Sequence, residues 1–434
     1  MHIYFSGIGG SAISALAVIA KEAGYEVSGS DARNSQYLDY LRKKGIEDIH
    51  VGLSRDQIAE VHARNPIDWY VYGSAQAFDF PDNEEFAFCR EMGIKSTKRD
   101  ELINEILSQK HLKLVAIAGT HGKTTTTAMA IWLFKQLGIP ISYSGGAKIS
   151  FGDMSRYEAG SDYFIYEADE FDRNFLAFHP FYSIIAGVAY DHHEIFPTQD
   201  DYNQAFRDFL AQSQRAILWE EDVSRLSLDK SDEKFTVESY EDSGIRNIKL
   251  AGLYNRRDAW LVIKAASQIT GARVEDLFEL MNRFPGVSRR FEKIIDNLYS
   301  DSAHTPEKIT GAMNVAREAV GQSGQKLIVI YEPLTNRRMH HTHEQHRAVF
   351  AGADQIYWVP SFLAREDPSL PILTPEQLIK DLEPGLQRVA RPARRDDNLK
   401  QIIQEHLKNG DLVLAMSGGG GDSLDDWLRK EFQA

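Results

Sequence analysis

The chain has 434 residues, 43% of them hydrophobic and 26% charged, which is enough for two to three folded domains without a long disordered part. The formal net charge of −14 disfavours nucleic acid as the main partner, because proteins that bind its backbone concentrate Lys and Arg. A single cysteine, Cys89, excludes a disulfide within the chain. With no apparent signal peptide or membrane-spanning apolar run, we expect a cytoplasmic protein that does not engage a membrane.

The first α/β element is a glycine loop between two predicted strands, residues 2–6 and 26–31. The loop Gly7-Ile8-Gly9-Gly10-Ser11-Ala12 has the G-x-G-x-x-A spacing of a phosphate-binding turn, and Asp31 stands where a ribose-binding acid would be. One interpretation is a dinucleotide site, as in an NAD-dependent dehydrogenase. The other is a tight turn that only connects strand to helix.

The α/β alternation continues beyond this loop. A strand at residues 68–72 leads into Gly73-Ser74-Ala75, and a helix over residues 83–92 is followed by another strand. Such alternation predicts one α/β domain that ends near residue 107.

A second glycine turn follows the apolar run 114–118. The turn is Gly119-Thr120-His121-Gly122-Lys123-Thr124-Thr125, and residues 128–134 then predict a helix. Strand, glycine turn, Lys-Thr and helix is the arrangement that binds nucleotide phosphates: amide groups and the helix N-terminus face the anion, Lys adds a charge, and Thr can ligate Mg²⁺. The usual first glycine of the Walker pattern would fall at Ile117, so the loop is a shortened one.

Two later strands deliver possible metal ligands at their carboxyl ends. The strand at residues 162–166 runs into the acids Glu167, Asp169, Glu170 and Asp172, and the run 183–190 ends in Asp191-His192-His193-Glu194. A solvated acidic loop is the default interpretation of such a cluster. Its place at a strand end after a phosphate loop instead favours carboxylates that hold Mg²⁺ against phosphates.

A third α/β unit begins near residue 295. The turn-rich segment 283–292 precedes it and contains Arg289-Arg290, which are surface residues or phosphate contacts. Strands are predicted at residues 298–301, 326–331, 355–359 and 411–416. The run from His340 to His346 lacks the H-E-x-x-H spacing of zinc proteases, so we expect a solvated loop that enters a helix.

Together these segments resemble the Mur ligase family over nearly the whole chain. The motifs that carry the resemblance are Gly119 to Thr124, the acids from Glu167 to Glu170, Asp191-His192, the segment with Arg290 and Glu292, and Asp301 to Pro306. The resemblance implies an α/β protein with three domains. They are a Rossmann-like UDP-sugar domain at residues 1–107, a central ATPase domain of the P-loop type at residues 108–294, and a Rossmann-like domain for the amino substrate at residues 295–434.

The implied activity is that of an ATP-dependent ligase in cytoplasmic peptidoglycan synthesis, which joins UDP-N-acetylmuramate to an amino acid through an acyl phosphate. L-alanine is the favoured amine. A ligase that attaches a murein tripeptide during cell-wall recycling is the alternative, because Glu332-Pro333-Leu334-Thr335-Asn336 and the Ser417 to Gly421 turn are closer to that subgroup. A monomer or weak homodimer is expected. A relative that only binds nucleotide as a regulator would lose the metal ligands, which this chain has.

The resemblance also assigns residues. Lys123, His192, Arg290 and His304 would be catalytic, and Thr124, Glu167 and His192 would hold Mg²⁺ or Mn²⁺. ATP would contact the following set: Gly119, Thr120, His121, Gly122, Lys123, Thr124, Thr125, Asn255, Arg290 and Asp301. The UDP-sugar would contact Gly7, Ile8, Gly9, Gly10, Ser11, Asp31, Ser74 and Ala75. Thr335, Asn336 and Arg337 would contact the amino substrate.

Overall fold

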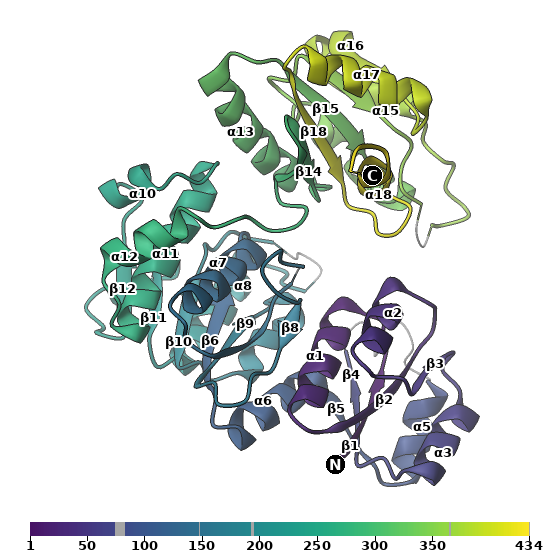
Figure 1. Ribbon diagram of the computed structural model, residues 1–434, viewed down its shortest axis with the longest axis vertical. Helices are drawn as coiled ribbons and strands as arrows, with labels where there is room; N and C mark the ends of the chain where they lie inside the picture. The colour runs from purple at the N-terminus through teal and green to yellow at the C-terminus, as the bar shows by residue number, and fades with distance from the viewer. Residues whose placement is uncertain (74–82, 147, 192–194, 364–365, 434) are drawn as a thin grey trace. The chain divides into compact units, whose positions relative to one another are not determined.

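The computed structural model describes residues 1–73, 83–146, 148–191, 195–363 and 366–433. It divides into two compact units (Figure 1): unit 1 comprises Met1–Lys249 and Tyr254–Phe284, and unit 2 comprises Leu250–Leu253 and Pro285–Ala434. Unit 1 contains two sheets and unit 2 contains one, which confirms the α/β class. Within the described ranges, no helix is long and apolar enough to cross a membrane.

The first sheet of unit 1 has five parallel strands in the order β3-β2-β1-β4-β5. The strands are β1 (His2–Ser6), β2 (Glu26–Asp31), β3 (Ile49–Val51), β4 (Trp69–Tyr72) and β5 (Lys95–Lys98). The helices are α1 (Ser11–Glu22), α2 (Gln36–Lys43), α3 (Arg55–Arg64), α5 (Glu84–Glu91) and α6 (Arg99–Gln109). Strand order reverses at β1, so the glycine loop after this strand lies at the edge where such sheets bind ligands.

The second sheet of unit 1 has the order β12-β11-β10-β6-β9-β7-β8, parallel except for β7 with β8. Its strands are β6 (Lys113–Ala118), β7 (Ile141–Ser144), β8 (Ser155–Arg156), β9 (Tyr163–Glu167), β10 (Tyr182–Ile185), β11 (Ala216–Trp219) and β12 (Phe235–Glu238). Its helices are α7 (Lys123–Gln136), η1 (Phe171–Ala177), α8 (Gln199–Gln212), α9 (Glu220–Arg225), α10 (Ser243–Asn247), α11 (Leu253–Thr270) and α12 (Val274–Met281). Since β6 pairs with β9 on one side and β10 on the other, the segments that follow all three strands meet at one edge.

Unit 2 is built on a six-stranded sheet of order β13-β14-β18-β15-β16-β17, parallel except for the β13–β14 pair. The strands are β13 (Glu292–Ile295), β14 (Leu298–Asp301), β15 (Leu327–Glu332), β16 (Gln355–Trp358), β17 (Ala390–Pro392) and β18 (Leu412–Ser417). The helices are α13 (Pro306–Ser323), α14 (Asn336–Thr342), η2 (His343–His346), α15 (Pro375–Ile379), α16 (Pro384–Val389), α17 (Asp397–Lys408) and α18 (Leu424–Phe432). Separate apolar cores cover its two faces.

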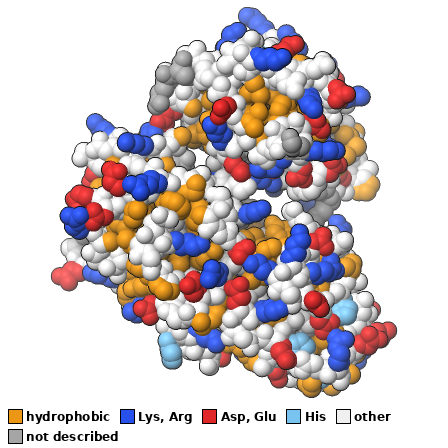
Figure 2. All heavy atoms as spheres, viewed as in Figure 1, with side chains coloured by type: hydrophobic (Ala, Val, Ile, Leu, Met, Phe, Trp, Pro, Cys, Tyr) orange, Lys and Arg blue, Asp and Glu red, His pale blue; other side chains and the backbone are white. Residues whose placement is uncertain are grey.

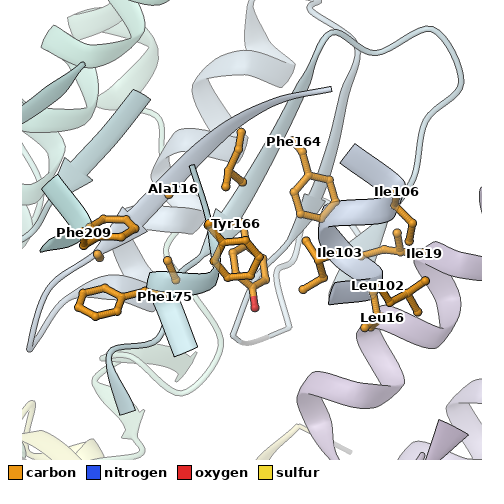
Figure 3. Packing of buried hydrophobic residues seen from close by; sticks show 14 of the residues in the cluster. Leu16, Ile19, Leu102, Ile103, Ile106, Ala116, Phe164, Tyr166, Phe175 and Phe209 are labelled. Atoms are coloured by element: carbon orange, nitrogen blue, oxygen red, sulfur yellow. The ribbon is translucent and has the colours of Figure 1, made fainter. Parts of the chain in front are cut away.

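One apolar core runs through both sheets of unit 1. Figure 3 shows Leu16 and Ile19 of α1 near Ile103 of α6, with Phe164 and Tyr166 of β9 continuing the cluster. Buried hydrogen bonding adds to this packing, because the Ser155 hydroxyl on β8 donates to the carbonyl of Ala15 on α1 at 2.9 Å. The first and second sheets are therefore joined by packing and not only by the chain. On the outside, acidic and basic side chains are mixed over the face shown in Figure 2.

Three segments differ from the expectations. The strand predicted at 183–190 ends at Ile185, because the chain turns away at Gly187, which has a φ of +138°. Residues 216–219, for which no strand was predicted, form the buried strand β11. The histidine run is helical, and His346 is buried with Nε2 3.2 Å from the Tyr331 hydroxyl, so the expected solvated loop is wrong.

Candidate active site

The second glycine turn connects β6 to α7 and needs its glycines for two physical reasons. Gly119 has a φ of +140°, and a Cβ there would lie 3.0 Å from the carbonyl oxygen of Gly187. Gly122 has a φ of +80°, and a Cβ would lie 2.5 Å from Oδ2 of Asp258. Helix α7 has no side-chain cap and no acid in its first turn, so its N-terminal amides form a site suited to phosphate.

Lys123 stands at the start of α7. Its Nζ donates to the carbonyl oxygen of Gly119 at 2.7 Å and lies 2.9 and 2.7 Å from the two carboxylate oxygens of Glu170. Glu170 is fully buried. The Glu170 carboxylate therefore orients the ammonium group and balances its charge. A cation held in this way is pre-oriented to bind phosphate. Sequence reasoning included Glu170 in the acidic cluster but gave it no role.

Thr124 and Glu167, two of the three predicted metal ligands, lie next to each other. The Thr124 hydroxyl donates to Glu167 Oε1 at 3.0 Å, and Glu167 Oε2 accepts the Gly146 amide at 2.8 Å. A hydroxyl and a carboxylate beside a phosphate loop are oxygen ligands that Mg²⁺ prefers, and it usually takes only one or two carboxylates with the substrate phosphates. The residues therefore fit Mg²⁺. His192, the third predicted ligand, lies outside the described residues, and the described part of the chain has no cluster of three or more acidic, His or Cys ligands.

The remaining loop residues have distinct surroundings. The Thr120 hydroxyl donates to the Ala189 carbonyl at 2.7 Å, accepts its amide at 2.8 Å, and contacts the hydroxyl of Tyr202. This ties the loop to the segment that leads to Asp191. His121 is exposed, and Thr125 is half-buried on the first turn of α7.

Helix α11 brings a further acid against the loop. Asn255, the predicted adenine contact, is half-buried in its first turn, and Asp258 follows three residues later on the same side of the helix. Asp258 is buried beneath Gly122, and this burial raises the pKa of its carboxyl to about 8. Asp258 was not among the predicted site residues. Its spacing from Asn255 was the signal that could have found it.

At the first glycine loop, Asp31 shapes the turn. Its Oδ2 accepts the Gly9 amide at 2.8 Å, and its Oδ1 accepts the Arg33 amide at 3.0 Å. A Cβ on Gly9 would lie 2.8 Å from Asp31 Oδ2. Helix α1 then starts at Ser11 without a side-chain cap, and Ile8 is fully buried. Ser74 and Ala75 lie outside the described residues.

In unit 2, the predicted ATP contact Asp301 lies at the carboxyl end of β14. Asp301 accepts the amides of Phe291 and Ala303, each at 2.8 Å, and so ties the segment with Arg290 to the segment with His304. His304 packs on Gly418, where a Cβ would come within 2.6 Å of the ring. Burial, together with the charges of Lys308, Arg338 and Arg290, lowers the pKa of His304 to about 4, so its ring is neutral at pH 7.

The predicted amino-substrate residues follow β15. Thr335 has a φ of +60° and caps α14 by accepting the Arg338 amide at 3.2 Å. Asn336 is buried, donates to the Pro371 carbonyl at 3.1 Å and accepts the Leu373 amide at 2.8 Å. The Arg337 side chain is exposed, and its amide donates to Glu366 at 2.9 Å. Thr335 and Asn336 therefore shape this segment, and Arg337 is the one directed to solvent.

Comparisons with known proteins cover the whole chain. Residues 2–111 match the family described as "Mur ligase family, catalytic domain", residues 117–267 match "Mur ligase middle domain", and residues 289–419 match "Mur ligase, glutamate ligase domain".

Curated relatives include the UDP-N-acetylmuramate–L-alanine ligases of Acetivibrio thermocellus and Agathobacter rectalis. The first is 28% identical, with 100% of this chain and 96% of the relative covered. The second is 30% identical, with 99% and 98% covered.

Two solved structures share the fold. The UDP-N-acetylmuramate–alanine ligase of Thermotoga maritima superposes with a TM-score of 0.77 at 23% identity, covering 100% of this chain and 98% of that one. A murein peptide ligase of Psychrobacter arcticus gives 0.61 at 22% identity, covering 100% and 97%.

Proposed function

The chain belongs to the Mur ligase family, and from this membership we propose that it joins UDP-N-acetylmuramate to L-alanine at the expense of ATP. The full-length similarity to UDP-N-acetylmuramate–L-alanine ligases carries the proposal. Because Mur ligases depend on ATP, the interpretation of the first glycine loop as the NAD site of a dehydrogenase is set aside. The first sheet takes the UDP-sugar, the central sheet takes ATP, and the third takes the amine, with boundaries near residues 107 and 294.

In the reaction, the muramate carboxylate attacks the γ-phosphorus of ATP, ADP leaves and an acyl phosphate forms. The amine then attacks the acyl carbon, phosphate leaves, and the nitrogen loses a proton as the amide forms. The protein's part is positioning and charge stabilisation. Lys123, oriented by Glu170, neutralises charge on the β- and γ-phosphates, and Arg290 and His304 would stabilise charge on the phosphates or on the tetrahedral intermediate.

Mg²⁺, or Mn²⁺, supplies further charge neutralisation at the phosphates when bound. Thr124, Glu167 and His192 would hold it. The hydrogen bond between Thr124 and Glu167 supports this assignment, because the hydroxyl and the carboxylate oxygen lie 3.0 Å apart beside the loop. Asn255 would contact adenine, and Asp301 would hold the segment with Arg290 to the segment with His304. We place the protein in the cytoplasm as a monomer or weak homodimer.

The decisive experiment compares amines. Phosphate release is measured with ATP, UDP-N-acetylmuramate and either single amino acids or the murein tripeptide L-alanyl-γ-D-glutamyl-meso-diaminopimelate. We expect L-alanine to give the highest kcat/KM. Release with the tripeptide alone would instead support the recycling reaction, for which the similarity to a murein peptide ligase is the supporting observation. Release with neither would refute the assigned amine.

A further inference from the structure

A cavity of about 250 Å³ lies within unit 1, between the start of α1 and the end of β9. Leu16, Ile19, Ile103 and Phe164 form its apolar part. Its polar part contains Ser11 and Ser144 together with three charged side chains, Arg99, Glu167 and Asp169. The cavity thus reaches from the first glycine loop to the carboxylate beside the phosphate loop. Its volume suits one arm of a substrate better than a whole nucleotide sugar.

Arg99 is the only cation among the described residues that line this cavity. Its side chain is 15% exposed, and its Nε lies 3.4 Å from Oδ1 of Asp100, the one acid paired with it in the described part of the chain. A guanidinium group has five N–H donors, and this pairing uses its Nε side. The fork formed by the two terminal nitrogens is the part that matches a carboxylate in two parallel hydrogen bonds.

Within the fold the charge of Arg99 interacts with two acids, Asp100 and Asp169, but its position is unfavourable for a cation. Arg99 is the first residue of α6, where the helix dipole disfavours a cation, and burial of a charge is unfavourable unless a partner compensates it. Two acids, Glu167 and Asp169, stand on the β9 side of the same cavity. A carboxylate substrate that enters the cavity would be repelled by these acids, and Arg99 is the cationic side chain of the lining that offsets part of the repulsion.

We propose that Arg99 binds the carboxylate of the acid substrate and holds it in this cavity beside Glu167. The proposal rests on the function proposed above, because it takes the acid to be the lactyl arm of UDP-N-acetylmuramate. The methyl group of that arm meets the apolar wall of Leu16, Ile19, Ile103 and Phe164. The pyrophosphate belongs instead to the glycine loop and the uncapped start of α1.

Calorimetric titration with two ligands tests this assignment. UDP-N-acetylmuramate carries the carboxylate, and UDP-N-acetylglucosamine has the same nucleotide, pyrophosphate and acetamido group without it. We expect Arg99→Ala to weaken binding of UDP-N-acetylmuramate by about 30-fold or more, and to leave binding of UDP-N-acetylglucosamine unchanged. Arg99→Lys keeps the charge but loses the fork, so its affinity for UDP-N-acetylmuramate falls between those of wild type and Arg99→Ala.

Lys98→Ala is the matched control, because Lys98 is the neighbouring cation, pairs with Asp172 at 2.8 Å and does not line the cavity. It should bind both ligands like wild type. Equal weakening of both ligands by Arg99→Ala would overturn the proposal in favour of a pyrophosphate contact or a structural role. Unchanged binding of UDP-N-acetylmuramate would also overturn it. If the wild-type protein bound UDP-N-acetylglucosamine as tightly as UDP-N-acetylmuramate, the lactyl arm would add no affinity. That result would refute the proposed function itself.

Discussion

Lys123 and Glu170 form an ion pair in which the ammonium nitrogen lies 2.7 and 2.9 Å from the two carboxylate oxygens. The acid is fully buried, and the lysine side chain is 14% exposed. The ammonium group is held by protein oxygens alone, namely this carboxylate and the carbonyls of Gly119 and Thr120. This pairing makes the phosphate loop depend on a residue 47 positions away in the chain.

Substitution of Lys123 separates catalysis from folding. We expect Lys123→Ala to lower kcat by about 10³-fold or more, because the phosphates lose their main protein cation. It should also lower the melting temperature, since it removes the cation that balances a buried carboxylate. UDP-N-acetylmuramate binding, measured by calorimetry, should not change.

The double variant Lys123→Ala/Glu170→Gln removes the buried charge as well. Its melting temperature should recover toward wild type while kcat stays low. Near wild-type turnover in either variant would show that the phosphate loop is wrongly assigned.

Gly122 and Gly138 allow a matched comparison of backbone strain and steric fit. Both have positive φ, +80° and +69°, but a Cβ on Gly138 meets nothing within 4 Å, while one on Gly122 lies 2.5 Å from Asp258. Each Ala substitution costs about 1–2 kcal/mol for the left-handed backbone. Gly122→Ala should cost about 1–3 kcal/mol more from overpacking and should weaken ATP binding, whereas Gly138→Ala should not. Urea unfolding and ATP titration measure both effects, and equal losses would contradict the contact with Asp258.

The acid at the end of β9 and the acids after it should differ in their effect on metal dependence. Glu167→Gln should raise the Mg²⁺ concentration for half-maximal activity by about 10-fold or more, because Glu167 is the acid that meets Thr124. Asp172→Asn is the control, since Asp172 pairs with Lys98 instead. Activity against Mg²⁺ concentration checks this, and identical curves for the two variants would remove Glu167 from the metal site.

The raised pKa of the Asp258 carboxyl predicts that the stability of the folded protein depends on pH. Burial raises the pKa of this carboxyl to about 8, whereas the unfolded residue titrates near 4. Between these values the folded protein holds a proton that the unfolded chain has lost, so this group's contribution to stability falls as pH rises, by up to about 1.4 kcal/mol per pH unit. Above pH 8 the contribution is constant.

Asp258→Asn should therefore be more stable than wild type at pH 8 and similar to it near pH 4, as measured by urea unfolding across this range. Asp222→Asn is the comparison, because burial raises the pKa of Asp222 to about 6. The difference in stability between this variant and wild type should stop growing near pH 6, and not near pH 8 as for Asp258→Asn. If the free energy of unfolding of Asp258→Asn fell with pH as steeply as that of wild type, another group would control the pH dependence.

The acidic cluster after β9 shows what sequence alone can and cannot predict. Its place at a strand end beside a phosphate loop could be predicted from the sequence, because the patterns that indicate strands and turns are local. The separate roles were not: Glu167 meets Thr124, Glu170 meets Lys123 and Asp172 meets Lys98. Those partners come from different elements, so the fold decides which acid faces which cation. The contact of the buried Asp258 with Gly122 was missed for the same reason, although its spacing from Asn255 is a local signal.

The shared core of unit 1 has a consequence for the evolution and engineering of the chain. Leu16 and Ile19 of the first sheet's helix pack in one cluster with Phe164 and Tyr166 of the second sheet. A fragment cut after residue 107 would expose this apolar face to water and would be prone to aggregate. Recombination that exchanges the first domain among relatives must therefore carry over matching side chains on β9, and the two segments are expected to change together over evolution.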